Sequence, residues 1–497
     1  MTDLLIERGV PSTLRHTDRL YINGEWVAPR GTRGFDVVDA STEETFLHVA
    51  EAGPAEMDAA IAAARHAFDH SPWPTLEPAE RAVYLRRLAE GLRARSDELG
   101  TFWTREAGAT YSMTRFAVQR VPAGFDYFAD LAESYPFVTP AKPEFSPFGV
   151  VAKEPVGVVA AIVPWNTALS LAAHKVAPAL LAGCTIVLKA PPEAPGELYV
   201  LAEIAEEIGL PPGVLNLVTA DREVSEQLVR DPRIDKVSFT GSSVVGKRIA
   251  SILGERVGRY TLELGGKSAA LVLDDWDMEA AAQTLAAAEC SITGQVCSSL
   301  TRVIVSRARH DEFAEALGAA FGAKLVGDPF DPASSIGPLA MQRQQERVLG
   351  YVQKGIDEGA TLVTGGRRPE HLDRGWYVEP TVFSNVDNRS TIAQEEIFGP
   401  VISVIPADDV DQAIDMANDT VYGLNSAVFT HDVDAAYRIA RRLRTGTVGH
   451  NGFKADAQMG LGGFKQSGIG REGGIQGILP YLESKSIILD DVPESFR

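Results

Sequence analysis

The sequence predicts an α/β protein with two doubly wound α/β domains, and three observations support this fold class. The chain has 497 residues, which at roughly 150 residues per domain leaves room for two to four domains. From Val156 onward, apolar strand-like runs alternate with helical runs, and a second alternation begins near Ser268. Continuous apolar strands separated by helices are typical of parallel sheets that are covered on both faces.

The first quarter of the chain is helical in pattern. The runs Met57 to Phe68 and Arg81 to Leu99 contain no proline and place apolar residues at helical spacing. Prolines between residues 136 and 147 then break the chain, so the following segment, Gly149 to Pro155, is expected to be extended.

Strands and helices then follow in two series. The first comprises the strand Val156 to Val163, the helix Leu169 to Ala182, the strand Thr185 to Lys189, the helix Glu197 to Gly209, the strand Leu215 to Val218, the helix Val224 to Asp231, the strand Lys236 to Thr240 and the helix Val244 to Leu253. The second comprises the strand Ala269 to Leu273, the helix Asp277 to Ser291, the strand Arg302 to Ser306 and the helix Asp311 to Leu325. The second domain is therefore expected to begin after Glu263.

Charge and cysteine content exclude several classes of protein. The net charge of −20 opposes binding to nucleic acid or to an anionic membrane. No apolar run approaches the roughly 18 to 20 residues that span a bilayer, and Met1 to Val10 lacks a cationic segment followed by an apolar one. Three cysteines without zinc-like spacing predict neither a disulfide framework nor a metal site. We therefore expect a cytoplasmic protein.

Two segments are candidates for binding a phosphate. Gly468 to Gly473 satisfies G-x-G-x-x-G, but no apolar strand precedes it, so we do not interpret it as a Rossmann fingerprint. In Phe239 to Gly246 a strand ends and a helix begins, which presents free backbone N–H groups to an anion, and Ser242 adds a hydroxyl. The alternative is that Ser242 is an ordinary helix N-cap.

Lys189 closes a buried strand at the carboxyl end of the predicted sheet, where α/β proteins bind ligands. A cation at that place suits ribose hydroxyls or a phosphate. The alternative is a lysine that merely leaves the core at the end of a strand.

Cys297 is the candidate nucleophile. It follows a helical stretch and lies among small polar residues, a setting in which a thiol can react. A buried structural thiol is the alternative for Cys297, and it is the expected role of Cys184 and Cys290, which lie in apolar or amphipathic runs.

Glu263 and Asn166 supply a base and an amide donor. Glu263 ends a strand between two leucines, which raises a carboxyl pKa toward that of a useful general base, although a pair with Lys267 is the alternative. Asn166 follows Pro164 and Trp165 at the end of a strand, where its amide suits a developing oxyanion. A turn-forming role is the alternative for Asn166.

Seven motifs in this order resemble those of the NAD(P)-dependent aldehyde dehydrogenase superfamily, and the resemblance covers nearly the whole chain. They are Pro164-Trp165-Asn166, the Lys189 segment, Phe239-Thr240-Gly241-Ser242, Leu262 to Lys267, Gly294-Gln295-Val296-Cys297, Glu395 to Pro400 and Gly462 to Gly468. Each motif is moderately specific. Seven in register identify the chain as a member of the superfamily.

The resemblance implies a role for each site residue. Cys297 is the implied nucleophile, Glu263 the general base, and Asn166 with the Cys297 N–H the oxyanion hole. The implied cofactor-binding residues are Trp165, Lys189, Gly241, Ser242, Gly246, Leu264, Glu396 and Phe398. Lys175 and Glu472 match positions that some members use in proton transfer, and a salt bridge is the alternative for both.

The resemblance also implies three structural units. A cofactor-binding domain is expected from 1–135 and 155–264, a catalytic domain from 265–466, and a small β bridging and oligomerisation segment from 136–154 and 467–497. The strand Ser484 to Leu489 is apolar, and its otherwise exposed edge suits pairing with a neighbouring subunit in a homodimer or homotetramer.

NAD is the favoured cofactor, and NADP remains open. Many NAD-preferring relatives carry a glutamate three residues after the lysine of this motif, where it binds the adenosine ribose. Here that position is Pro192, and Glu193 stands one residue further on.

The implied chemistry is oxidation of an aldehyde to the acid through a Cys297 thiohemiacetal and thioester, which water activated by Glu263 hydrolyses. An inactive dehydrogenase scaffold should lack Cys297 or Glu263, and both are present. A thiol hydrolase would not need Lys189, Glu396 and Phe398. Relatives that form acyl-CoA usually lack the Glu263-type base, so a free acid product is favoured.

The resemblance further predicts a wide substrate funnel. The matching positions are Thr167, His174, Ser291, Ala455 and Leu461, where relatives that take small aldehydes often carry aromatic residues. A medium or bulky aldehyde is therefore expected.

Overall fold

The strand Val158–Ile162 (β7) explains why the first sheet is buried on both faces. Val159 and Ala161 belong to one hydrophobic core, whereas Val158 and Ala160 belong to a second core. Successive side chains of a strand point to opposite faces, so an entirely apolar strand needs cover on both sides. The computed structural model, which describes residues 8–9 and 12–497, provides that cover with helices.

The first sheet has eight strands, five of which form its parallel centre. In spatial order they are β19 (Gly468–Ile469), β11 (Arg259–Glu263), β10 (Lys236–Thr240), β7, β8 (Thr185–Ala190), β9 (Leu215–Thr219), β1 (Leu20–Ile22) and β2 (Glu25–Val27). The two edges of the sheet are antiparallel, because β19 pairs with β11 and β1 pairs with β9 in that sense.

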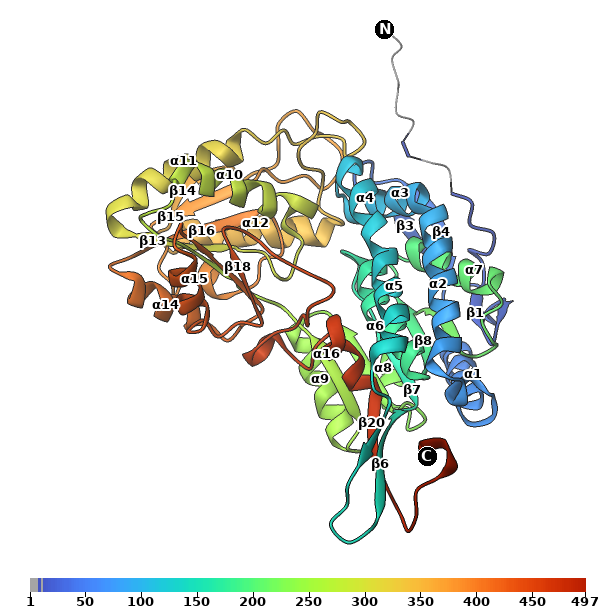
Figure 1. Ribbon diagram of the computed structural model, residues 1–497. Helices are drawn as coiled ribbons and strands as arrows, with labels where there is room; N and C mark the ends of the chain where they lie inside the picture. Colours follow the sequence, from blue (N-terminus) through green and yellow to red (C-terminus); the bar gives the residue numbers. More distant parts are fainter. Residues whose placement is uncertain (1–7, 10–11) are drawn as a thin grey trace.

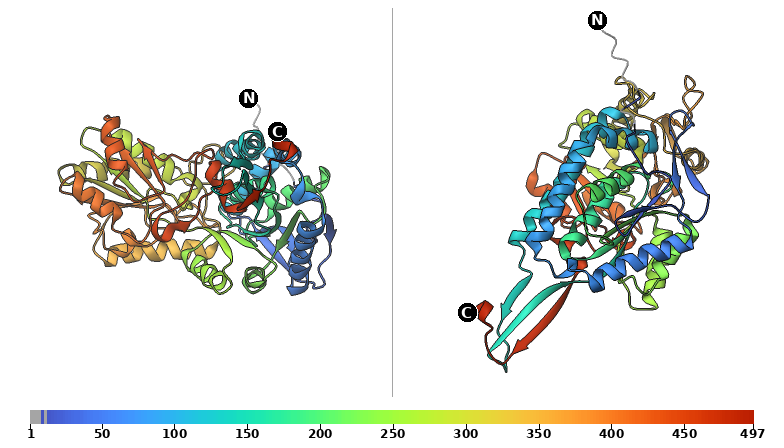
Figure 2. Two further views of the ribbon diagram at one scale, coloured as in Figure 1. Left: turned by 60° about the horizontal axis from the view of Figure 1, so that its bottom comes forward. Right: turned by 90° about the vertical axis from the view of Figure 1, so that its right-hand side faces the viewer.

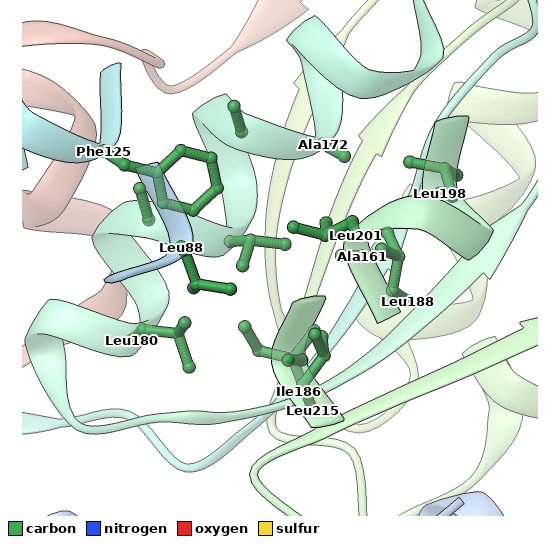
Figure 3. Close-up of a cluster of buried hydrophobic side chains, with 14 of the residues drawn as sticks. Leu88, Phe125, Ala161, Ala172, Leu180, Ile186, Leu188, Leu198, Leu201 and Leu215 are labelled. Carbon is green, nitrogen blue, oxygen red and sulfur yellow. The ribbon is translucent and has the colours of Figure 1, made fainter. Parts of the chain in front are cut away.

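Helices cover both faces of this sheet (Figure 1). One core receives side chains from α2 (Pro78–Ala94), α5 (Val121–Ser134), α6 (Ala168–Ala182) and α7 (Gly196–Glu207). The other receives side chains from α1 (Pro54–His70), α8 (Arg222–Arg230) and α9 (Ser243–Gly254). Figure 3 shows the first core, where Leu88, Phe125 and Leu180 of the helices gather with Ala161 and Leu188 of the strands.

The second sheet forms the other lobe of the molecule in Figure 1. Its seven strands are, in spatial order, β14 (Thr361–Thr364), β15 (Thr381–Ser384), β16 (Val401–Ala407), β13 (Arg302–Ser306), β12 (Ala269–Val272), β17 (Asn425–Phe429) and β18 (Thr447–His450). Only the pairing of β14 with β15 is antiparallel. The helices of this lobe are α10 (Met278–Glu289), α11 (His310–Gly322), α12 (Gln342–Asp357), α13 (Thr391–Gln394), α14 (Val410–Asn418) and α15 (Val433–Ala440).

An arm of three antiparallel strands projects from the first lobe (Figure 2). It consists of β5 (Val138–Ala141), β6 (Phe148–Pro155) and β20 (Leu482–Leu489), with β6 in the middle. The register runs from Leu482 opposite Pro155 to Leu489 opposite Phe148, so segments far apart in sequence complete one sheet.

The structure confirms most of the expected elements and adds some. The run Arg81 to Leu99 is divided at Arg95, whose backbone leaves the helical region, so α2 is followed by a separate α3 (Ser96–Ala107). The hairpins β1–β2 and β3 (Gly34–Val38) to β4 (Thr45–Ala50) and the short α4 (Tyr111–Ala117) are additions.

The C-terminal segment is divided between two sheets. The strand β19 falls in the range 467–497 assigned to the bridging segment, yet it pairs with β11 of the first sheet. The short helix α16 (Gly474–Ile478) packs on α6, and only β20 joins the arm.

Residues 1–7 and 10–11, which include most of the segment considered for a targeting signal, lie outside the described residues. Among the helices of the described ranges, none combines the length and the apolar character that a membrane crossing requires.

Candidate active site

A cavity of about 450 Å³ brings together residues from both lobes. The first lobe contributes residues 164–174, where β7 leads into α6, and the ends of β10 and β11. The second lobe contributes Cys297 with its neighbours and the Glu396 to Phe398 segment. The cavity therefore lies at the carboxyl ends of the parallel strands, as expected for an α/β protein.

The loop before Cys297 has an unusual backbone. Ile292, Thr293 and Gly294 have φ values of 48°, 55° and 69°, a left-handed run that ordinary residues rarely adopt. A Cβ atom on Gly294 would lie 2.3 Å from the carbonyl carbon of Gly399, so only glycine fits there. Long-range contacts must therefore hold this loop.

Gln295 supplies several of those contacts. It is fully buried, and its Nε2 donates to the carbonyl oxygens of Ala107 at 2.9 Å and Ile292 at 3.1 Å. Its Oε1 accepts from the backbone N–H of Ala340 at 2.9 Å. The side chain thus ties residues 292–297, called the nucleophile loop here because Cys297 is the candidate nucleophile, to both lobes.

Cys297 lines the cavity and is partly exposed, whereas Cys184 and Cys290 are buried. Burial, followed by the nearby carboxyl groups of Glu396 and Glu263, raises the pKa of the Cys297 thiol to about 12. The thiol is consequently protonated at neutral pH in this state, and a nucleophilic role requires removal of that proton.

Asn166 lies beside the nucleophile loop. The side chain is buried, and its Nδ2 donates to the carbonyl oxygen of Gln295 at 2.8 Å. The backbone carbonyl of Asn166 accepts from Trp103 Nε1 at 2.7 Å, which fixes the turn. Because an amide has two N–H donors, one remains for a substrate oxygen.

Glu263 ends β11 and lines the cavity, so its predicted place at the end of a strand is confirmed. It is buried, and its Oε1 has no hydrogen-bond partner among the described residues. Burial, reinforced by the charge of Glu472, raises the pKa of the Glu263 carboxyl well above its usual range. A carboxyl in such a setting is suited to proton transfer near neutral pH.

The glycines after Glu263 allow three segments to approach each other. A Cβ on Gly265 would lie 2.4 Å from Glu396 Oε2, and one on Gly266 would lie 2.4 Å from the carbonyl oxygen of Cys297. The N–H of Gly266 also donates to Glu396 Oε1 at 3.2 Å. The Leu262 to Lys267 motif thus brings the end of β11 against the nucleophile loop and the Glu396 carboxylate.

Lys175 and Glu472 form the buried ion pair that the sequence left as one of two alternatives. Lys175 Nζ also donates to Thr240 Oγ1 at 2.6 Å. Ser238 Oγ donates to Glu472 Oε1 at 3.2 Å, and Tyr481 donates to Ser238 at 3.1 Å. This network adjoins Glu263, and its part in proton transfer remains a prediction.

The residues predicted to bind a phosphate lie at the start of α9. Ser242 is the N-cap of α9 and accepts from the Val245 N–H at 3.4 Å, while Gly241 and Ser242 line the cavity. Gly246 lies outside the lining and packs on Leu264, where a Cβ would come within 2.4 Å of that side chain. The close packing of α9 against Leu264 therefore explains why residue 246 is a glycine.

Lys189 is the penultimate residue of β8 and lies outside the cavity lining, and burial lowers its pKa to about 8. Glu193 follows on the next loop and forms an ion pair with Arg343, the second residue of α12. The carboxylate of Glu193 is thus occupied by a cation from the other lobe. Whether Glu193 binds a ribose remains a prediction.

Trp165 and Phe398 both line the cavity and contact each other edge to face, with ring centroids 5.5 Å apart at an interplanar angle of 88°. Glu396 lines the same region, and burial raises its pKa to about 7. Two flat apolar surfaces beside a hydrogen-bond acceptor suit a heteroaromatic ring attached to a sugar.

Comparison with known proteins identifies the chain. The aldehyde dehydrogenase family model matches residues 26–487. The chain belongs to the aldehyde dehydrogenase family. It is 42% identical to geranial dehydrogenase from Castellaniella defragrans, over 96% of this chain and 99% of that protein. It is 39% identical to 3-succinoylsemialdehyde-pyridine dehydrogenase from a Pseudomonas species, with the same coverage of 96% and 99%.

Solved structures agree. An aldehyde dehydrogenase from Mycobacterium tuberculosis in complex with NAD⁺ has a TM-score of 0.93 and 44% identity, over 95% of this chain and 98% of that one. A mutant of aldehyde dehydrogenase C from Pseudomonas syringae in complex with NAD⁺ and octanal has a TM-score of 0.94 and 38% identity, over 98% and 100%. The predicted family, fold and aldehyde dehydrogenase activity are confirmed.

The aldehyde dehydrogenase cavity includes most of the predicted funnel residues. Thr167, His174, Ala455 and Leu461 line it, and burial lowers the pKa of His174, which favours its neutral form. Ser291 does not line it. Ser291 instead lines a separate cavity of about 200 Å³ together with Cys290, because the left-handed run turns the chain between Ser291 and Cys297.

The sequence missed several residues of the lining. Leu171, Leu424 and Phe453 add apolar surface, and Gln344 and Arg347 of α12 add polar groups. The helical spacing of Leu171 four residues after Thr167 was a usable signal. Phe453 lies in an irregular loop, so no periodicity pointed to it.

Proposed function

We propose that this enzyme oxidises medium or bulky, mainly apolar aldehydes to carboxylic acids through a covalent Cys297 intermediate. The observation that carries the proposal is the meeting of Cys297, Asn166 and Glu263 in one cavity with Trp165, Glu396 and Phe398.

Cys297 begins the reaction after its thiol gives its proton to solvent water in the cavity. The thiolate adds to the aldehyde carbon, and the second N–H of Asn166 holds the oxygen as it becomes negative. Collapse of the resulting alkoxide re-forms the carbonyl and expels a hydride, which leaves a thioester on Cys297. NAD, when bound, accepts that hydride.

Glu263 completes the cycle. In its ionised form it takes a proton from water, and the hydroxide attacks the thioester carbon. The carbon–sulfur bond breaks, which releases the carboxylic acid and the Cys297 thiolate. The Lys175–Glu472 pair is the proposed acceptor for the proton that Glu263 must then give up.

The cofactor is proposed to lie on Trp165, Lys189, Gly241, Ser242, Gly246, Leu264, Glu396 and Phe398. The N-terminus of α9 suits a phosphate. Glu396 offers an acceptor for the hydroxyls of the nicotinamide ribose, and Phe398 would pack near the nicotinamide ring. Two structural relatives are NAD⁺ complexes, which favours NAD. NADP remains open, because the nearest glutamate, Glu193, is paired with Arg343.

A panel of aldehydes tests the function. With NAD or NADP and the unmodified enzyme, absorbance of the reduced cofactor should rise with octanal or geranial, and kcat/KM should exceed that for acetaldehyde by at least tenfold. Each methylene buried against the apolar lining contributes about 0.8 kcal/mol. Thr167→Phe should reduce this preference, because it narrows the cavity. A better rate with acetaldehyde would refute the proposed substrate class.

We also propose a cytoplasmic homo-oligomer, a dimer or a tetramer. Among the described residues, the strand β20 pairs only with β6, so its other edge has no partner there, and Ile488 on the arm is 63% exposed. Light scattering of the enzyme and of Ile488→Lys tests the assembly. The variant should dissociate if β20 lies in the interface.

A further inference from the structure

Phe398 has a backbone conformation that is unfavourable for an aromatic residue. Its φ is 64°, in the left-handed region. Such a residue keeps this conformation only where surrounding contacts impose it, and these sites often present a side chain to a ligand. Phe398 and Glu396 both face the cavity, so the contacts that impose this conformation also fix two proposed cofactor residues.

One face of helix α12 supplies these contacts. Gln344 Nε2 donates to the carbonyl oxygens of Phe398 at 2.6 Å and Ile397 at 3.2 Å. Arg347 donates from Nε to Ile397 O at 3.2 Å and from its second nitrogen to Glu396 O. Three successive carbonyl groups are therefore held by two side chains, three positions apart on the helix.

Tyr351 extends the same face by another turn. Its hydroxyl donates to Glu395 Oε2 at 2.6 Å and accepts from Arg347 at 3.3 Å, and the Arg347 guanidinium lies 5.0 Å from the tyrosine ring centroid. Tyr351 is buried and lies outside the cavity lining. It therefore touches the 395–398 segment without facing the cavity.

The held segment also contacts the nucleophile loop. A Cβ on Gly399 would lie 2.4 Å from Val348 of α12, and Gly399 in turn packs directly on Gly294. A shift of the 395–399 segment would consequently reach both the nicotinamide side of the cavity and the loop that carries Cys297.

We propose that Arg347 and Tyr351, with Gln344, are positioning residues that hold residues 395–398 in the conformation that binds the nicotinamide end of the cofactor. This inference rests on the proposed function, because it takes Glu396 and Phe398 as cofactor residues. Arg347 acts through three backbone and side-chain acceptors. Tyr351 acts only through Glu395 and Arg347.

The test compares Arg347→Met and Tyr351→Phe with the matched control Gln345→Met. Gln345 is the neighbour of Gln344 and is equally buried, but it donates to the carbonyl oxygen of Tyr377 at 2.8 Å, away from the cofactor segment. For each protein we would measure the dissociation constant of NADH by fluorescence, the KM for NAD and kcat with saturating octanal, and the melting temperature.

We expect Arg347→Met to raise the NADH dissociation constant and the KM for NAD about tenfold over the control. Tyr351→Phe, which keeps the shape of the ring, should raise both at least threefold at an unchanged melting temperature. The NADH dissociation constant and the KM for NAD of Arg347→Lys should be close to those of Arg347→Met, because one ammonium group cannot replace the several N–H donors of a guanidinium.

Three results would overturn the inference. The first is a dissociation constant for NADH, in both Arg347→Met and Tyr351→Phe, that is within twofold of the Gln345→Met value. The second is an unchanged NADH dissociation constant in Tyr351→Phe together with a raised one in Arg347→Met, which would mean that Arg347 contacts the cofactor directly. The third is full recovery in Arg347→Lys, which would point to charge alone. Failure of the unmodified enzyme to reduce NAD with octanal would instead refute the proposed function.

Discussion

The two sides of the cavity are held in place by different means. On the side proposed to bind the cofactor phosphates, called the phosphate side, Ser242 lies between the end of a strand and the start of a helix. Its contact with Val245 is local. On the nucleophile side, three left-handed residues precede Cys297, and contacts from residues 107, 340 and 399 hold them. The phosphate side should therefore tolerate substitution, whereas the nucleophile side should fail when one distant contact is lost.

The largest expected effect is that of Cys297→Ala. The variant should lose aldehyde oxidation completely, because no covalent intermediate can form, yet it should bind NADH with nearly unchanged affinity. Absorbance at saturating octanal and NADH fluorescence measure the two properties. Cys184→Ala and Cys290→Ala are the controls and should retain activity. Turnover in Cys297→Ala would remove its assignment as nucleophile.

Glu263→Gln should reduce steady turnover by roughly 10²- to 10⁴-fold, the usual contribution of a general base. Rapid mixing should still show the first burst of reduced cofactor, since water is needed only for deacylation. Burial raises the Glu263 pKa, so the group is ionised only as pH rises through that pKa, and kcat of the unmodified enzyme should increase with pH accordingly. The variant should lose this dependence. Equal loss of burst and turnover would place Glu263 earlier, at the Cys297 thiol.

Gly294→Ala tests the nucleophile side directly. The new Cβ would lie 2.3 Å from Gly399 at a φ of 69°, so the loop must shift. A displacement of about 1 Å costs on the order of 10²-fold in rate, and we expect a loss of that size in kcat with NADH binding retained. The control is Gly124→Ala on α5, where a Cβ meets nothing within 4 Å. Normal kcat in Gly294→Ala would show that the loop adapts freely.

Ser242→Ala should have the smallest effect. Loss of the N-cap costs about 0.5–2 kcal/mol of stability. Loss of the proposed hydroxyl contact to the cofactor phosphate should in addition raise the KM for NAD a fewfold while kcat is unchanged. Asp277→Ala removes the N-cap of α10, far from the proposed cofactor, and should lower the melting temperature without changing KM. If the KM for NAD is the same in both variants, Ser242 acts only as the N-cap of α9 and does not contact the cofactor.

The same contrast explains what the sequence could predict. Glu263 and Lys189 lie at the ends of strands and Ser242 at the start of a helix, and the alternation of strand-like runs with helical runs locates such ends well. Small, polar neighbours distinguished Cys297 from Cys184 and Cys290, but its role as nucleophile came from the resemblance, because its geometry depends on Gly399 and Ala340, which no local pattern connects to it. Ser291 was assigned to the funnel by the same resemblance, and the left-handed turn directs it elsewhere.

Interactions between side chains of distant segments could not be predicted from the sequence. The hydrogen bonds from α12 to residues 395–398 depend on how two turns of the helix pack against an irregular segment. The pair of Glu193 with Arg343 joins the two lobes. Gln344, Arg347 and Tyr351 do share helical spacing, but nothing in the sequence shows which segment they contact, and no pattern connects Glu193 with Arg343.

The arm has a consequence for biosynthesis. The strand β6 pairs with β5 soon after translation, but its other partner, β20, lies near the C-terminus. At roughly 5 to 20 residues per second, the about 330 residues between them take on the order of 16 to 65 s to appear. During that interval one edge of β6 stays open to any other strand in the cell. Expression yield should therefore depend on elongation rate and on chaperones more than the stability of the finished enzyme suggests.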